Sequence, residues 1–160
     1  MMSLTQMAVD VLTFQNGRGK TALSLHYANI WFEARANGTV IDIETVQPPL
    51  QPALPEKPTL LSSHEVPKRK PGTLPGQIAL LHAVVHIKLN AVDLHWDIIP
   101  RFRHIEMPPG FYDDWVKAAD DESKYFNMMC DCLEALDSYY GALTTNADIY
   151  MLPSIPHQTL

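Results

Sequence analysis

The 160-residue sequence has only two cysteines, contains no long apolar run and has no excess of basic residues. Cys130 and Cys132 stand two positions apart, so on a helix their side chains point in well-separated directions. Neither a disulfide nor a shared metal is expected from them, and a reducing, cytoplasmic location is the expectation. No apolar run approaches the roughly 20 residues of a membrane helix, so no membrane span is expected. The N-terminus also lacks the basic start of a signal peptide.

Positive charge is scarce as well. Twelve Lys and Arg face 18 Asp and Glu, which gives a net charge of −6 and leaves no basic field for a phosphate backbone. No nucleic-acid partner is therefore expected. The one basic cluster, residues 68–70, lies between prolines and is expected to be a solvated loop. A hydrophobic content of 46% fits a domain able to bury a core.

The sequence GRGKT at residues 17–21 resembles part of a phosphate-binding loop. Such a loop needs a further Gly five positions before its second Gly, where its backbone wraps the phosphates. Phe14 occupies that position. Nucleotide binding is therefore disfavoured, and a turn that connects two helices is the simpler prediction.

Composition divides the chain into four parts. Proline is concentrated in one stretch, where each ring removes a backbone donor and fixes φ, so that stretch is predicted to be extended and without regular structure. It is either draped over the helices or a semi-rigid spacer. The predicted parts are an N-terminal helical segment (1–46), a Pro-rich arm (47–75), a helical hairpin (76–141) and an irregular tail (142–160).

The central helix of the hairpin, residues 75–101, shows the strongest periodicity. An apolar stripe recurs every three or four residues: Ile78, Leu81, Val85, Leu89, Val92, Trp96 and Ile99. Polar side chains flank it, with His82, His86, Asp93 and Asp97 on one edge and Lys88 and His95 nearer the other. The simpler interpretation is a core helix with a polar edge in water. The alternative is the wall of a site inside a helical bundle.

The last helix is predicted from Phe111 to about Tyr139, with Gly141 ending it. Its expected buried stripe is Phe111, Trp115, Ala118, Glu122, Phe126 or Tyr125, Met129, Leu133 and Leu136. A carboxylate on an apolar face is costly unless it is paired, protonated or bound to a metal. Glu122 is therefore either an ion-pair partner of Lys88 or Lys124, a hydrogen-bond acceptor, or a metal ligand.

Three blocks, EVPKRK (65–70), LLHAVVHIKLNAVDLHWDII (80–99) and FYDDWVKAADDESKYF (111–126), resemble a ferritin-like family catalogued as domain of unknown function 455. The resemblance runs from about residue 52 to residue 141. It implies an all-α, ferritin-like helical bundle similar to carboxylate-bridged di-iron proteins, which use Glu and Glu-x-x-His ligands.

The resemblance places the family's metal ligands at Lys88, Glu122 and Tyr125, so only Glu122 keeps ligand chemistry. A Lys ammonium repels a cation, and Tyr replaces imidazole poorly in such a site. Lys88 is therefore expected to pair with Glu122 in place of the metal's charge. If iron or manganese still binds, Glu122, His86 and His82 are the candidate ligands, because His82 and His86 share a helix face.

The resemblance also implies two further long helices, where this sequence continues only into LPSIPHQTL. The expectation is a truncated or diverged bundle that self-associates or binds a protein over its exposed helical face. A non-catalytic protein with a degenerate metal site and no cofactor is the first hypothesis. The alternative is a di-iron oxidoreductase or hydroxylase completed by oligomerisation.

Overall fold

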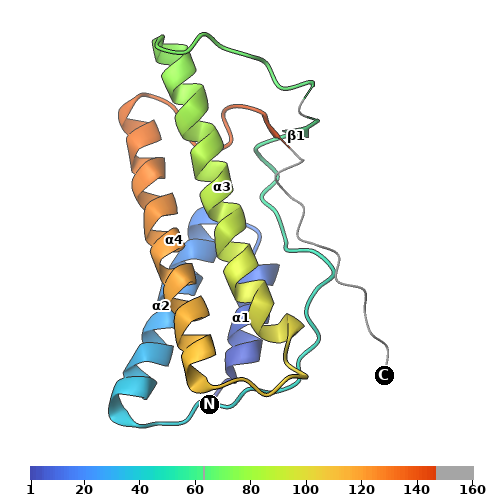
Figure 1. The fold of residues 1–160 in the computed structure, drawn as a ribbon. Helices are drawn as coiled ribbons and strands as arrows, with labels where there is room; N and C mark the ends of the chain where they lie inside the picture. The colour runs from blue at the N-terminus through green and yellow to red at the C-terminus, as the bar shows by residue number, and fades with distance from the viewer. Residues whose placement is uncertain (63, 147–160) are drawn as a thin grey trace.

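The computed structural model describes residues 1–62 and 64–146, and these residues form a helical bundle (Figure 1). The all-α fold class is confirmed. A single pair of two-residue strands, joined in parallel, is the sole sheet in the described part of the chain. The elements are α1 (Leu4–Thr13), α2 (Gly17–Asn37), β1 (Leu60–Leu61), α3 (Leu74–Arg101), α4 (Pro109–Ala135) and β2 (Thr145–Asn146).

The two N-terminal helices begin and end at residues suited to those positions. Ser3 caps α1 by accepting a hydrogen bond from the Gln6 amide, and Asn16 caps α2 in the same way. Gly38 ends α2 in the left-handed conformation with φ 76°. The prediction of a connecting turn at GRGKT is wrong, because residues 17–21 are the first turns of α2.

Helix α3 follows its predicted boundaries closely. The Thr73 hydroxyl accepts from the Gly76 amide at the start, and Pro75 occupies the first turn, where its missing N–H costs nothing. The predicted stripe is buried from Val85 to Ile99, and its first two members are half-buried. Pro100 lies inside the final turn, and the helix ends directly after it at Arg101.

Helix α4 departs from the prediction in register and in length. Its buried residues are Tyr112, Val116, Ala119, Ser123, Phe126, Cys130 and Leu133, so most of the stripe lies one position after the expected one. Glu122 is therefore half-buried at the side of the helix rather than in the core. The helix ends at Ala135 because Asp137 adopts φ 59°, and Gly141 lies in the turn that follows.

Helices α3 and α4 run antiparallel side by side and form the main contact of the bundle, with α1 and α2 packed against one end of the pair (Figure 1). The larger cluster of buried side chains joins all four helices and includes Trp31, Trp96 and Val116. A smaller cluster around Phe126 and Leu89 continues between α3 and α4 toward the other end. The hairpin is thus covered by other helices over only part of its length.

The Pro-rich arm lies along α3, so of the two arrangements left open by the sequence the draped one is correct (Figure 1). It is not wholly irregular, because β1 pairs with β2 just after α4. The arm-facing edge of α3 carries His82, His86, Asp93 and Asp97, all at most 7% exposed. The prediction of a polar edge in water is therefore wrong. The rest of the predicted tail, residues 147–160, lies outside the described residues.

Helix α3 is the one helix of the described part that is long and apolar enough to cross a membrane, with a mean hydropathy of 1.2 over 18 residues. The sequence expectation missed this because it looked for an uninterrupted apolar run. A core helix meets the same criteria. In this fold α3 contacts α1, α2 and α4.

Candidate functional site

The residues that the family resemblance marks as ligands meet on the side of the hairpin that other helices do not cover. Lys88 of α3 and Glu122 of α4 form an ion pair with a Nζ–Oε2 distance of 2.9 Å. The Lys88 ammonium also lies 5.4 Å from the centre of the Tyr125 ring, a cation–π distance. The expected pairing of Lys88 with Glu122 is present.

His95 follows Lys88 by seven residues, about two turns of α3, and lies beside this ion pair. Its ring lies 5.4 Å from the Trp115 ring, and its Nδ1 is buried without a hydrogen-bond partner among the described residues. Burial lowers the pKa of His95, while Glu122 raises it and Lys88 lowers it. A neutral imidazole beside a neutralised pair leaves little net charge around Lys88 and Glu122.

His82 and His86 occupy a different environment, under the segment that follows α4. Both rings stack on Tyr140, with centroids 5.4 and 6.0 Å apart. His86 Nδ1 lies 2.6 Å from the Tyr140 hydroxyl, and the Gly141 amide donates to His82 Nε2 at 3.0 Å. Burial, first among the causes, lowers the pKa of each histidine to about 4, so both are neutral at pH 7.

The three candidate metal ligands do not come together. His86 precedes Lys88 by two residues, a rotation of about 200° on a helix, so the histidines and the Glu122 pair lie on different sides of α3. Within residues 1–62 and 64–146, no group of three or more His, Cys, Asp or Glu side chains is placed to hold a metal ion. The donor set at Glu122 also does not fit a divalent cation, because the nearest cation is an ammonium at 2.9 Å.

Sequence reasoning missed a buried ion pair beneath the arm. Lys20, fully buried, donates to Asp93 Oδ1 at 2.6 Å and to the Ala53 carbonyl of the arm at 2.8 Å. Burial lowers the pKa of Lys20 and raises the pKa of Asp93 to about 7, and the attraction between the two charges opposes both shifts. The sequence did contain a signal for this pair. The three- and four-residue spacing of the buried positions of α2 continues toward the N-terminus through Ser24 to Lys20, which places Lys20 on the buried face.

A second cation–carboxylate pair repeats this arrangement one turn further along α3. Arg101 donates to both carboxylate oxygens of Asp97, at 2.6 and 3.1 Å, and to the Pro49 carbonyl at 3.2 Å. Each pair therefore binds one backbone carbonyl of the arm. Because proline lacks an N–H, these carbonyl acceptors supply much of the hydrogen bonding of the arm, beside the Ala53 amide that donates to the Leu12 carbonyl.

The opposite side of α3 is apolar and open. Leu80, Ile87 and Leu94, spaced seven residues apart, are 69%, 42% and 37% exposed. Three further apolar residues follow them at four-residue spacing on this side of the helix and are half-buried: Val84, Ala91 and Ile98. An apolar face of a helix is normally covered by another element. This surface, the outer face of α3, is therefore an unfilled contact surface within the described structure.

Comparison with known proteins assigns the chain to a protein family. A family model described as "Protein of unknown function (DUF455)" matches residues 13–153. A curated protein of Haemophilus influenzae, described as uncharacterized, is 37% identical over 103 residues. That match covers 61% of this chain but 36% of the relative, so the chain spans about a third of the relative's length. No solved structure matches the chain.

Proposed function

The chain belongs to the protein family of unknown function 455, and from that premise we propose that it is a ferritin-like helical protein with a degenerate metal site. It acts by association of two copies through the outer face of α3, and it is not a catalyst. The observation that carries this proposal is the ion pair between Lys88 and Glu122, which stands where the resemblance places metal ligands and lies near the open apolar face.

The ion pair supplies the positive charge that a metal would otherwise provide. Glu122 is about one-fifth exposed at its side chain, so its carboxylate needs a counter-charge, and the Lys88 ammonium meets that need. The Tyr125 ring covers the ammonium from one side. The ammonium thus balances the charge of the carboxylate at 2.9 Å, although Glu122 Oε2 receives no hydrogen bond of good geometry from the described residues.

The spacing on the outer face favours a second copy of this chain as its partner. Leu80 and Leu94 lie seven residues on either side of Ile87, so the pattern is symmetric about Ile87. In an antiparallel contact between two α3 helices, Ile87 meets Ile87 while Leu80 meets Leu94. A two-fold contact requires this self-complementarity, and seven-residue spacing is the packing period of paired helices.

Sedimentation equilibrium tests the association. We expect wild-type protein to approach twice the 18.0 kDa mass of the chain and Ile87→Lys to remain monomeric, because the substitution buries a charge at the two-fold axis. The matched control is Val40→Lys, which places the same charge at an exposed loop position outside α3 and leaves the dimer intact. A wild-type monomer, or a dimer insensitive to Ile87→Lys, overturns the association.

Metal analysis tests the degenerate site. Protein expressed with added iron and manganese is expected to hold far less than one metal per chain by mass spectrometry, with the same value for Glu122→Ala. Near-stoichiometric metal that disappears in Glu122→Ala contradicts the degenerate site and favours the di-iron oxidoreductase. Sedimentation tests only the association and metal content tests only the degenerate site, so one part of the proposal can be wrong while the other holds.

A further inference from the structure

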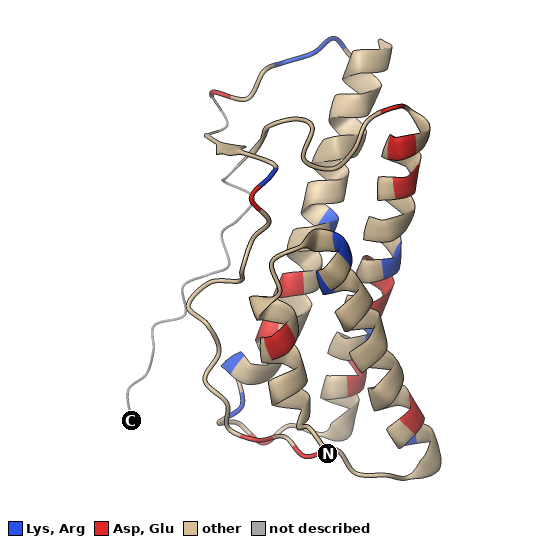
Figure 2. Cartoon of the chain, turned by 180° about the vertical axis from the view of Figure 1, so that it is seen from behind, with Lys and Arg blue, Asp and Glu red and all other residues tan. Residues whose placement is uncertain are grey.

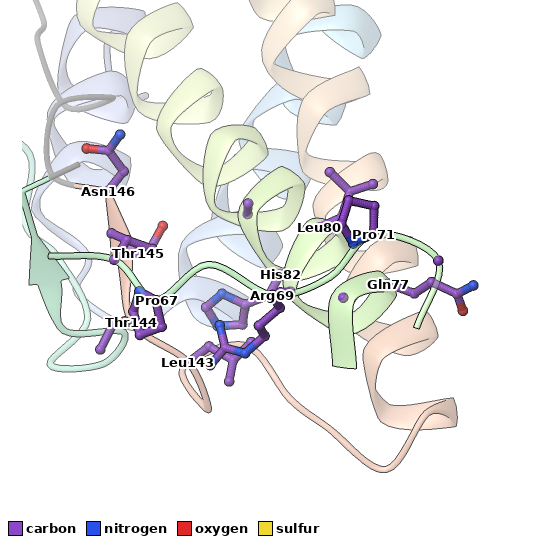
Figure 3. A pocket seen from close by; sticks show the side chains of 15 residues that line it. Pro67, Arg69, Pro71, Gln77, Leu80, His82, Leu143, Thr144, Thr145 and Asn146 are labelled. Carbon is purple, nitrogen blue, oxygen red and sulfur yellow. The ribbon is translucent and has the colours of Figure 1, made fainter. Parts of the chain in front are cut away.

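A cavity of about 390 Å³ lies between the arm and the N-terminal half of α3 (Figure 3). This volume is within the range of small-molecule sites, roughly 300–1,000 Å³. Its apolar walls include Pro67, Leu80 and Leu143, and its polar lining includes Arg69 and His82. We call it the Arg69 cavity. It is distinct from the Lys88–Glu122 pair, and it meets the outer face of α3 only at Leu80.

The charge around the cavity is positive, in a chain that is acidic overall. None of the lining residues is Asp or Glu, and α3 carries no charged side chain before Lys88. Figure 2 shows the basic segment 68–70 passing along the arm beside this uncharged half of the helix. The basic cluster, expected from sequence to be a solvated loop, therefore contributes a lining residue to a cavity.

Arg69 is half-buried and makes no hydrogen bond or ion pair within the described residues. The four other arginines of the chain, Arg18, Arg35, Arg101 and Arg103, all bond to a carboxylate, an amide or a carbonyl. A guanidinium presents five donors in a planar fork that matches a carboxylate, so a half-buried one with no protein partner is available to pair with an anionic ligand.

His82 supplies a neutral donor beside Arg69. Its side chain is buried, and its Nε2 accepts a hydrogen bond from the Gly141 amide. The proton of the neutral ring therefore resides on Nδ1, for which residues 1–62 and 64–146 offer no acceptor. Figure 3 shows the His82 ring next to the Arg69 side chain. Burial and the Arg69 charge both lower the pKa of His82, which keeps the ring neutral.

We propose that the Arg69 cavity binds a small organic monocarboxylate. The Arg69 guanidinium pairs with the carboxylate, His82 Nδ1–H donates to it, and the apolar body of the molecule lies against Pro67, Leu80 and Leu143. One cation and one neutral donor match the single charge of a carboxylate, whereas a phosphate carries nearly twice that charge. This site does not include the Lys88–Glu122 pair, and it shares only Leu80 with the proposed dimer contact.

Amide NMR titration of the full chain tests the site, with benzoate as the carboxylate probe, benzamide as its neutral counterpart and inorganic phosphate as the competing anion. Saturable shifts with benzoate, centred on residues 66–72 and 76–83, are the expected result. Benzamide is expected to bind at least about tenfold more weakly, because it lacks the charge that strengthens the pairing. Phosphate is expected to leave these amides unshifted.

Two variants distinguish a specific contact with Arg69 from attraction by the positive charge of residues 68–70. Arg69→Gln is expected to weaken benzoate binding at least about tenfold, whereas Lys70→Gln, which removes the same charge from an exposed neighbour, changes it less than about twofold. Arg69 bonds to no described residue, so the helical circular-dichroism signal of Arg69→Gln should match wild type. No saturable shift, equal binding of benzamide, or equal loss in both variants overturns the proposal. Arg69-dependent binding of phosphate without benzoate overturns the carboxylate assignment.

Discussion

The two sides of α3 reverse the usual distribution of residues. The side beneath the arm is polar and buried, with Asp93 and Asp97 at 1% and 7% exposure, whereas the outer side is apolar and open. Hydrophobicity alone would assign the two sides the other way round. What decides burial here is which segment covers each side.

The difference follows from what each side offers its neighbours. The buried side is covered by a proline-rich arm that brings carbonyl acceptors, so charged donors such as Lys20 and Arg101 are needed to hold it. The outer side offers only apolar contact, which suits another helix. One side is thus a completed structural contact, and the other is the surface at which we propose that a second copy binds.

The largest expected effect comes from breaking the buried pair. Asp93→Asn is expected to destabilise the chain by about 3 to 5 kcal/mol, because it leaves the Lys20 ammonium buried without a counter-charge. Urea unfolding followed by circular dichroism measures this change. The double variant Lys20→Met with Asp93→Leu should recover most of the loss, since it removes both charges together.

The matched control for this prediction is Asp131→Asn, which removes a carboxylate from the exposed pair with Arg18. Its unfolding midpoint should stay near that of wild type, because exposed ion pairs contribute little. If Asp93→Asn behaves like this control, the Lys20–Asp93 pair does not hold the arm on α3. The contrast drawn between the two sides of α3 is then wrong.

A smaller effect is expected from pH. The pKa values of His82 and His86 are lowered to about 4 in the folded chain, so between about pH 6.5 and 4 the unfolded chain binds protons that the folded chain does not. Stability is therefore fully present above pH 6.5 and is lost as pH falls toward 4. Asp93, with a pKa raised to about 7, acts in the opposite direction and reduces the change of unfolding free energy with pH.

His82→Gln isolates the contribution of one histidine, because a Gln oxygen accepts the Gly141 hydrogen bond but does not titrate. The slope of unfolding free energy against pH between 4.5 and 6 should fall by about 1 kcal/mol per pH unit. The exposed His104 provides the control, and His104→Gln should keep the wild-type slope. Equal slopes for wild type and His82→Gln would show that His82 is not buried as a neutral ring.

Much of the fold is predictable from the sequence because local signals agree. Ser3, Asn37-Gly38, Thr73 and Pro75 mark helix ends by their own chemistry, and the apolar stripe of α3 specifies its packed side. The register of α4 is less predictable, because Phe111, Trp115 and Met129 are as apolar as the residues beside them that are buried. Only the partner helices decide between the two stripes.

The candidate site is predictable only in part. The ion pair between Lys88 and Glu122 follows from residue types at matching family positions, and the structure contains it. The contacts of Lys20 with Asp93 and of Tyr140 with the histidines join residues more than 50 positions apart in sequence. No local pattern encodes such contacts, because they depend on where the arm and the segment after α4 come to lie.

Cysteine cross-linking tests the central claim, that the outer face of α3 is a two-fold contact, most directly. In a Cys132→Ser background, where Cys130 remains buried, Ile87→Cys should form a covalent dimer under mild oxidation because the two copies place this position opposite itself. Leu80→Cys alone should stay monomeric, whereas an equal mixture with Leu94→Cys should cross-link. Absence of the Ile87→Cys dimer, or cross-linking of Leu80→Cys by itself, would contradict the account.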